Sequence, residues 1–322
     1  MLGLLEIFVL VLTLALSFII FVPLTGVLVR FRANYNPKGL QLDSEGNAQP
    51  HTGPVITSYF AMFKRVYQIE GWSGLYKGLM PTLLSTLFVT AIILLFMDTP
   101  SPSHGKYVAP NTSILGTLFY SILMMLLSLP TSVITYRSIT TPLRLPYLNP
   151  AKSLRVLLTP TERRKPWILY LTPGLLAASV LHILIVVLFL GPIRRLLVPP
   201  LETGAFEKIS FWRLGVYIVV MIAATIVLSP LEVVAVRLAL QRNHASADYN
   251  SISQEINADA DEQEAEFAGN EEDVIGLRSE TDPYLGLLDC GKRMIDEEGV
   301  FSLYRAWWIT LLGVLGSVAS AI

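Results

Sequence analysis

The stretch PLTGVLVR at residues 23–30 is the most informative part of the sequence, because its pattern occurs three times. The pattern returns as PTSVITYR at residues 130–137 and as PLEVVAVR at residues 230–237. Each copy has a proline inside a long apolar segment and an arginine seven residues later. The prolines lie 107 and then 100 residues apart. Repetition at such a regular period indicates one structural unit present in three copies.

The composition places these units in a membrane. Apolar residues make up 52% of the 322 residues and charged residues only 15%, and a helix crosses the hydrocarbon with about 20 mostly apolar residues. Six segments have this character: 7–31, 79–97, 113–136, 174–193, 211–236 and the shorter 307–322. The sequence therefore predicts an all-α membrane protein with six transmembrane helices in three repeats, at residues 1–98, 112–198 and 210–322.

The distribution of charge gives the orientation and excludes some partners. Nineteen of the 24 lysines and arginines fall on the side where the first, third and fifth helices end, so the three long connections are predicted to share one membrane face. The net charge of −1 offers no basis for nucleic-acid binding. A single cysteine, Cys290, excludes a disulfide within the chain.

The long connections repeat a second pattern. EGWSGLYKG at residues 70–78 matches EGVFSLYRA at residues 298–306. The residues that carry the match are Glu70, Gly71, Tyr76, Lys77 and Gly78 in the first copy and Glu298, Gly299, Tyr304 and Arg305 in the last. The middle connection keeps only WILY at residues 167–170 ahead of Pro173, which aligns if two residues are missing.

Two amphipathic stretches precede these patterns, at residues 55–69 and 285–296, and predict short surface helices along the membrane face. With these helices, the two repeated patterns resemble the mitochondrial carriers over nearly the whole chain. The resemblance implies the carrier fold with pseudo-threefold repeats and no cofactor. It also implies a place in a mitochondrial membrane, the inner one ahead of the outer one.

The resemblance further implies a gate on the matrix side. In carriers, an acid two residues after each kink proline reaches a base of the neighbouring repeat, and substrate binding compensates for breaking these ion pairs. Here the acid positions read Thr25, Ser132 and Glu232, and the first basic positions are uncharged, so three such pairs cannot form. We expect Glu232 to lie nearest to Arg30 or Arg137. The residues assigned to the gate are Pro23, Arg30, Pro130, Arg137, Pro230, Glu232 and Arg237.

Substrate contacts are carried over by position from the same family. Counting seven residues on from the end of each second pattern, with a shift in the middle copy, gives Ser85, Ala177, Ala178 and Gly313. All four are small or uncharged, which points to an uncharged or weakly polar substrate of unknown identity. His182, one turn further along the fourth helix, is the only histidine in a predicted membrane segment. It is either a cavity residue, the default for an intramembrane ionisable group, or a neutral imidazole bonded to a neighbouring helix.

An acidic insert interrupts the third connection. Residues 246–282 hold twelve acids and one base, Arg278, so they are predicted to form a disordered loop that membrane insertion does not need. A basic protein partner is one candidate ligand for this loop. Asp259 and Asp261 have the spacing that begins a calcium-binding loop, but the sixth position is Glu264 instead of glycine, so the sequence predicts no such loop and no metal site.

Catalysis has no support in the sequence, which lacks a nucleophile elbow, a His-Glu-x-x-His motif and a phosphate-binding glycine loop. Two functions remain open, and neither is enzymatic. The first is a solute transporter that alternates access to a site near the membrane midplane, with the lipid bilayer and an unknown small molecule as its partners. The second is a non-transporting carrier relative of the outer membrane that acts as an adaptor or in membrane dynamics or insertion.

Overall fold

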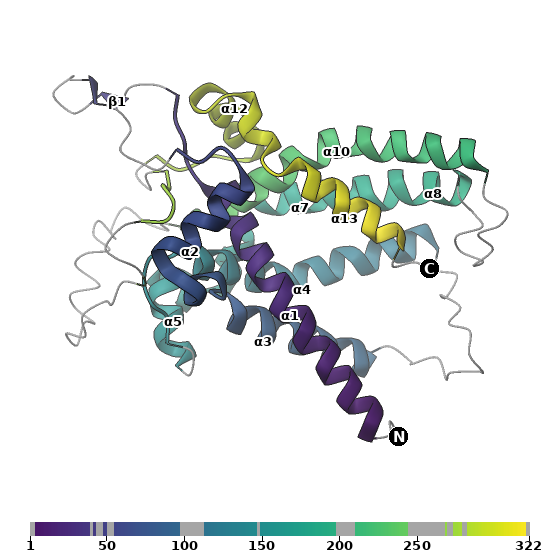
Figure 1. Ribbon diagram of the computed structural model, residues 1–322, viewed down its shortest axis with the longest axis horizontal. Coiled ribbons are helices and arrows are strands. Elements are labelled where there is room, and N and C mark those ends of the chain that lie inside the picture. Colours follow the sequence, from purple (N-terminus) through teal and green to yellow (C-terminus); the bar gives the residue numbers. More distant parts are fainter. Residues whose placement is uncertain are drawn as a thin grey trace. The chain divides into compact units, whose positions relative to one another are not determined.

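A computed structural model describes residues 4–38, 41–42, 48–49, 55–96, 113–146, 149–197, 210–243, 268, 273–278 and 282–319 (Figure 1). These residues are mostly helical. The only strands among them are the paired dipeptides β1 (Gln41–Leu42) and β2 (Ala48–Gln49). The all-α prediction is therefore confirmed.

The apolar helices coincide with the six predicted segments. Their bounds are α1 (Leu4–Ala33), α3 (Leu79–Phe96), α4 (Ile114–Thr140), α7 (Leu175–Leu184), α10 (Phe211–Leu240) and α13 (Trp307–Ala319). The fourth continues from α7 through the π-helix η2 (Ile185–Leu190) into α8 (Gly191–Leu197). Within the described part of the chain, four helices are long and apolar enough to cross a membrane, or up to six if each of two bent pairs is one span.

The three prolines lie inside α1, α4 and α10. A proline has no N–H to donate and its ring crowds the carbonyl four residues earlier, so a helix bends at this point. Each helix nevertheless continues beyond its proline and carries an arginine in its last turn: Arg30, Arg137 and Arg237. The sequence pattern thus fixes the distance between the kink and a positive charge at the helix end.

Short helices fill the long connections. They are α2 (Tyr59–Leu75), α5 (Pro150–Leu157), α6 (Pro160–Arg164), η1 (Pro166–Leu171), α12 (Leu287–Glu297) and η4 (Val300–Tyr304). The side chains of Ser58, Asn149 and Thr159 accept hydrogen bonds from the first turns of α2, α5 and α6, so polar caps define these helix starts. The two amphipathic stretches that predicted surface helices correspond to α2 and α12.

The chain separates into two compact units. Unit 1 comprises residues 1–84, 131–172 and 239–283. In this unit α1 packs against α2. Met62 and Val66 of α2 are fully buried four residues apart, which is the spacing of one helix face.

Unit 2 comprises residues 85–130, 173–238 and 284–322. Its core lies where α10 meets the π-helical stretch η2. Met221 and Leu228 of α10 are fully buried there together with Leu190, and Val314 and Leu315 of α13 pack against them. The core therefore ties the membrane helices of the second and third repeats together.

The second membrane helix of each repeat begins directly after a left-handed residue. These residues are Gly78, Gly174 and Ala306, with φ of 89°, 81° and 56°. A Cβ on Gly78 would lie 2.7 Å from the Cγ1 of Ile139, and one on Gly174 would lie 2.2 Å from the backbone nitrogen of Leu287. Glycine is therefore required at both positions for space as well as for conformation.

These left-handed residues correct the predicted register of the middle repeat. In the first and third repeats a buried leucine, Leu75 or Leu303, lies three residues before the left-handed residue; in the second, Leu169 lies five residues before Gly174. Counted to the left-handed residue, the middle repeat lacks no residues. The two extra residues lie at the end of η1, which continues to Leu171, whereas the turn before α7 (residues 172–174) is as long as the turn before α3 (residues 76–78). The position seven residues beyond Gly174 is Leu181.

Part of the acidic insert is ordered, in contrast to the prediction of a disordered loop over residues 246–282. Residues 273–278 take a defined conformation in which Val274 and Ile275 are only 7% and 6% exposed. The acidic composition of the whole insert concealed these two apolar side chains. Apart from residues 268, 273–278 and 282, the insert lies outside the described residues.

Candidate functional site

Each arginine that follows a kink proline forms a buried ion pair with a glutamate of its own repeat. The pairs are Arg30 with Glu70 at 2.5 Å, Arg137 with Glu162 at 2.6 Å and Arg237 with Glu298 at 2.5 Å. No side chain in these pairs is more than 4% exposed. A buried guanidinium needs such a partner, because the ion would otherwise lose its hydration without compensation.

The glutamates of the first and third repeats also bind the base of the second sequence pattern. The Nζ atom of Lys77 donates to Oε1 of Glu70 at 2.5 Å, and Nη2 of Arg305 donates to Oε2 of Glu298 at 2.9 Å. The glycine directly after each glutamate has a positive φ, 65° and 91°, a conformation that glycine adopts far more easily than other residues. The helical geometry is interrupted there in both repeats.

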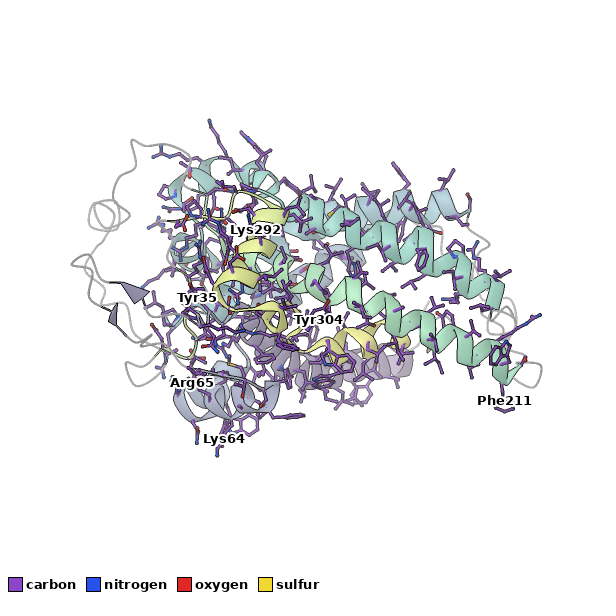
Figure 2. The ribbon with its side chains drawn as sticks, turned by 90° about the horizontal axis from the view of Figure 1, so that it is seen from above. Tyr35, Lys64, Arg65, Phe211, Lys292 and Tyr304 are labelled. Carbon is purple, nitrogen blue, oxygen red and sulfur yellow. The ribbon has the colours of Figure 1, made fainter. Side chains whose placement is uncertain are left out.

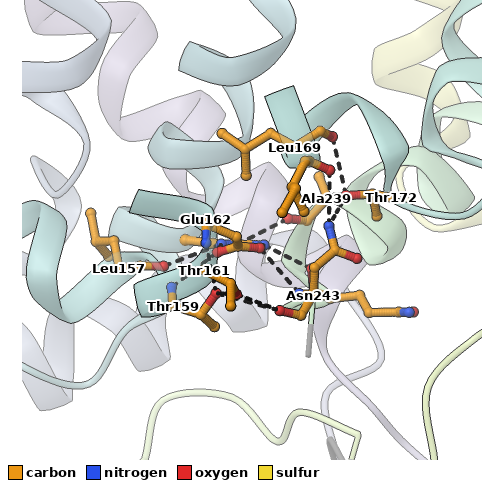
Figure 3. Close-up of polar contacts among 11 residues, drawn as sticks. Leu157, Thr159, Thr161, Glu162, Leu169, Thr172, Ala239 and Asn243 are labelled. Atoms are coloured by element: carbon orange, nitrogen blue, oxygen red, sulfur yellow. Dashed lines mark hydrogen bonds and ion pairs between the residues drawn. The ribbon is translucent and has the colours of Figure 1, made fainter. Parts of the chain in front are cut away.

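In the second repeat, the acid that pairs with the arginine lies in a different local structure (Figure 3). Glu162 is the third residue of α6, where its carboxylate accepts a hydrogen bond from the backbone N–H of Thr159 at 3.0 Å, and the Thr159 hydroxyl accepts one from the N–H of Glu162. This arrangement is a capping box. The same carboxylate accepts hydrogen bonds from both terminal nitrogens of Arg137, at 2.6 and 3.0 Å, and from the backbone N–H of Asn243 at 3.1 Å.

The environment of Glu162 stabilises its charged form. Burial by itself would raise the pKa of this carboxyl group, but the hydrogen bonds and charge of Arg137 and the two backbone donors hold the pKa below its usual range. This acid was not predicted from the sequence, because it does not belong to an acid-glycine pair. The signal in the sequence was TPTE at residues 159–162, which has the spacing of a capping box.

Within unit 1, two of these arginines also reach the following repeat. The Nε atom of Arg30 donates to the carbonyl oxygen of Ile139 at 2.9 Å, and Nε of Arg137 donates to the carbonyl oxygen of Ala239 at 3.3 Å. Ile139 and Ala239 each lie two residues after the arginine of the next repeat. We call these two contacts the arginine forks. Each joins a buried ion pair of one repeat to the end of the next kinked helix.

A second polar cluster lies among the membrane helices of unit 2. The Nε2 atom of His182 lies 3.5 Å from Oε1 of Glu232, and Oε2 of Glu232 accepts a hydrogen bond from the hydroxyl of Thr310 at 2.7 Å. These three residues, which we call the membrane polar cluster, join α7, α10 and α13. The side chains of His182 and Glu232 remain 35% and 26% exposed.

A known family accounts for much of the first and third repeats. Its sequence model, described as mitochondrial carrier protein, matches residues 38–101 and 217–322. The chain belongs to the mitochondrial carrier family. No curated protein matches it. The matched ranges contain both intact acid-glycine patterns, whereas the middle repeat, where Glu162 replaces that pattern, lies outside them.

Membership of the carrier family places the protein in a mitochondrial membrane as a multi-pass helical protein with the carrier fold. Mitochondrial carriers are transporters, not enzymes. Within the described ranges, no group of three or more histidine, cysteine, aspartate or glutamate side chains could hold a metal ion.

The substrate residues predicted for this carrier all lie in unit 2 and differ in burial. Ala178 is 1% exposed, Ala177 and Gly313 are exposed, and Ser85 is half-buried. His182 follows Ala178 by one helical turn on α7, and Gly313 follows the threonine of the membrane polar cluster by about one turn on α13. The cluster thus joins the helices that carry four of the five residues, whereas Ser85 lies on α3, which contributes nothing to the cluster.

Proposed function

We propose that this carrier moves a small uncharged or weakly polar solute across the membrane by alternating access to a site around the membrane polar cluster. The residues proposed to contact the solute are Ser85, Ala177, Ala178, His182 and Gly313. The observation behind the proposal is the pair of arginine forks. They join neighbouring repeats by hydrogen bonds that can break and re-form, so they can act as a gate although most of the family's ion-pair positions are uncharged.

Opening the arginine forks would require little free energy. Thr25 and Ser132 occupy acid positions without a charge, and the hydroxyl of Thr25 bonds to its own helix at the carbonyl of Phe21, at 2.7 Å. Closure then depends on hydrogen bonds from a guanidinium to carbonyl groups, each contributing about 1.5–3 kcal/mol. When a fork opens, its arginine keeps its glutamate, so no buried charge loses its partner. Weak binding of a solute can offset a cost of this size.

The membrane polar cluster favours a hydrogen-bonding solute over an anion. Glu232 is engaged with His182 and Thr310, and its negative charge would repel a dicarboxylate or a nucleotide, which would also lose hydration in the membrane. A neutral solute with hydroxyl or amide groups would exchange its bonds to water for bonds to the imidazole and the threonine hydroxyl. This supports the substrate class that the small, uncharged contact residues indicate.

Uptake into liposomes tests the proposal. Purified protein would be reconstituted and offered neutral polyols, amphipathic amides, dicarboxylates and nucleotides. We expect uptake of a neutral solute that falls about tenfold or more in His182→Ala, the loss expected from removing one or two hydrogen bonds. The matched control is Ser179→Ala on the same helix, because the Ser179 hydroxyl bonds within α7 to the carbonyl of Leu175. Exchange of a nucleotide or dicarboxylate that survives His182→Ala would contradict both the substrate class and the site.

A second candidate function is a non-transporting adaptor in the outer membrane. The uncharged residues at the gate positions favour it, because ion pairs within each repeat can hold the fold together in a protein that never opens. Submitochondrial fractionation separates the two candidates. An outer-membrane location with no uptake of any solute in the panel would support the adaptor, whereas an inner-membrane location with uptake would reject it.

A further inference from the structure

The ordered part of the acidic insert binds α2 of unit 1. Arg65 of α2 donates hydrogen bonds to the carbonyl oxygens of Val274 and Asp273, at 3.0 and 3.1 Å. The side chains of Val274 and Ile275 are buried at this place, whereas Leu277 in the same segment is 50% exposed. One side of the segment is therefore buried and the other is exposed.

The same segment binds the end of α1. The N–H of Tyr35 donates to the carbonyl oxygen of Gly276 at 2.7 Å, and the N–H of Gly276 donates to the side-chain oxygen of Asn34 at 3.0 Å. Asn34 is the first residue after α1 and is fully buried. Tyr35 and Arg65, which bind this segment from the end of α1 and from α2, are labelled in Figure 2. Residues 273–276 are thus joined to two elements of the first repeat.

A second part of the insert binds the end of α4. The N–H of Ala268 donates to the carbonyl oxygen of Pro142 at 2.9 Å, two residues after the last residue of α4, and Ala268 is 9% exposed. Ala268 and Asp273 are five positions apart, so the chain between them spans at most about 18 Å. The two attachments are therefore tethered to each other.

These attachments join the two helix ends that the first arginine fork also joins. That fork runs from Arg30 near the end of α1 to Ile139 near the end of α4. We propose that Ala268 and residues 273–276, together called the staple, act as a brake on opening by holding the ends of α1 and α4 together. The proposal rests on the alternating access proposed above. It adds that the first fork opens fully only when the staple releases.

Thiol labelling of the α4 end tests the staple. Ser138 is 2% exposed and directly precedes Ile139, so Ser138→Cys in a Cys290→Ala background reports separation of these helix ends. The protein would be held in lipid nanodiscs and treated with a membrane-impermeant maleimide. Ile275→Asp should accelerate labelling about tenfold, the change that loss of one or two hydrogen-bonded attachments produces. The matched control, Leu277→Asp, places the same charge on the exposed face of the segment and should leave the rate unchanged.

A separate measurement detects global unfolding. With Ser138 and Cys290 both native, Cys290 is buried in unit 2 and must stay unreactive in each variant. If Ile275→Asp exposes Cys290, the comparison is made with Arg65→Gln, which removes two donors to the staple without burying a charge. Arg293→Gln is its control, because Arg293 pairs within α12 with Asp289.

The outcomes separate the staple from transport. Equal labelling in the staple variant and its control would overturn the brake, whatever the uptake panel gives. Faster labelling in the staple variant would support it even if no solute is transported, and the failure would then belong to the proposed transport function.

Discussion

The hydroxyl of Tyr76 donates a hydrogen bond of 3.2 Å to the carbonyl oxygen of Ile19. Ile19 lies four residues before Pro23, so its carbonyl is the group that the proline leaves without a helical donor. The aromatic residue of the second pattern therefore completes the kink of the first. This relationship ties the two sequence patterns of the first repeat to each other physically.

We expect Tyr76→Phe to lower the free energy of unfolding by about 1 kcal/mol, because it removes one hydrogen bond and keeps the ring. Thermal unfolding in detergent, followed by circular dichroism, measures the change. The control is Tyr67→Phe, since Tyr67 packs edge-to-face on Trp72 with its ring. A loss of stability in both variants alike would show that the kink does not depend on this hydroxyl.

Glu162→Gln should be far more destabilising. It removes the charge that compensates the buried Arg137, and breaking a buried pair from one side costs about 3–5 kcal/mol. A double variant, Glu162→Gln with Arg137→Gln, should regain part of the loss because no uncompensated ion remains. The exposed Asp296→Asn serves as the control. Additive losses in the double variant would mean that the two residues do not act as a pair.

The same carboxylate should make stability depend on acid. Because its pKa in the folded protein lies below the ordinary value of 4.5, its stabilisation is fully present above that pH. The stabilisation is lost as the pH falls through the folded pKa, where the unfolded state has already bound the proton. The difference in melting temperature between the parent and Glu162→Gln should therefore shrink below a pH of about 4. A difference that stays constant as the pH is lowered well below that value would contradict the assignment.

Gly78→Ala should destabilise the protein by more than about 1 kcal/mol, because alanine is strained at a φ of 89° and its Cβ would lie 2.7 Å from Ile139. Gly116→Ala should have the opposite sign. Gly116 lies inside α4, and a Cβ added there would meet nothing within 4 Å, so alanine gains up to about 1 kcal/mol of helix propensity. Thermal unfolding of the two variants against the parent measures both effects. The same sign for both would refute this reading of the turn.

Arg30→Lys should open the first fork while keeping the charge. The guanidinium of Arg30 binds Glu70, the carbonyl of Gly74 and the carbonyl of Ile139 at once, and an ammonium group cannot reproduce that planar geometry. Labelling of Ser138→Cys should rise several-fold, as expected from loss of about one hydrogen bond. Arg293→Lys on α12 should not change it. Unchanged labelling in both variants would show that the arginine forks do not form part of the gate.

Much of the architecture could be predicted because membrane helices leave strong signals. The three proline-arginine stretches and the apolar segments gave the helices, the repeats and the family. Glu70 and Glu298 were found because they belong to a repeated pattern. His182 was found because an ionisable residue stands out in an apolar helix.

The parts that could not be predicted depend on local geometry. Glu162 was missed because a capping box, with no repeated pattern, sets its position. The register of the second repeat was wrong because η1 continues two residues beyond Leu169, which adds two residues before Gly174. Val274 and Ile275 were assigned to a disordered loop because composition averages over a segment, whereas docking needs only two well-placed side chains.

The position of Glu162 also bears on the order in which the chain is built. Its last hydrogen-bond donor, the N–H of Asn243, is synthesised 81 residues later. The carbonyl oxygen of Ala239, which accepts a hydrogen bond from Arg137, is likewise synthesised long after that arginine. Arg30 also donates to a carbonyl oxygen, that of Ile139, which is synthesised later. A nascent chain that has inserted only two of its three repeats therefore still has incomplete bonding around its second arginine. The hydrogen bonds around the end of α4, the third membrane helix, can therefore be completed only after α10, the fifth, has been synthesised.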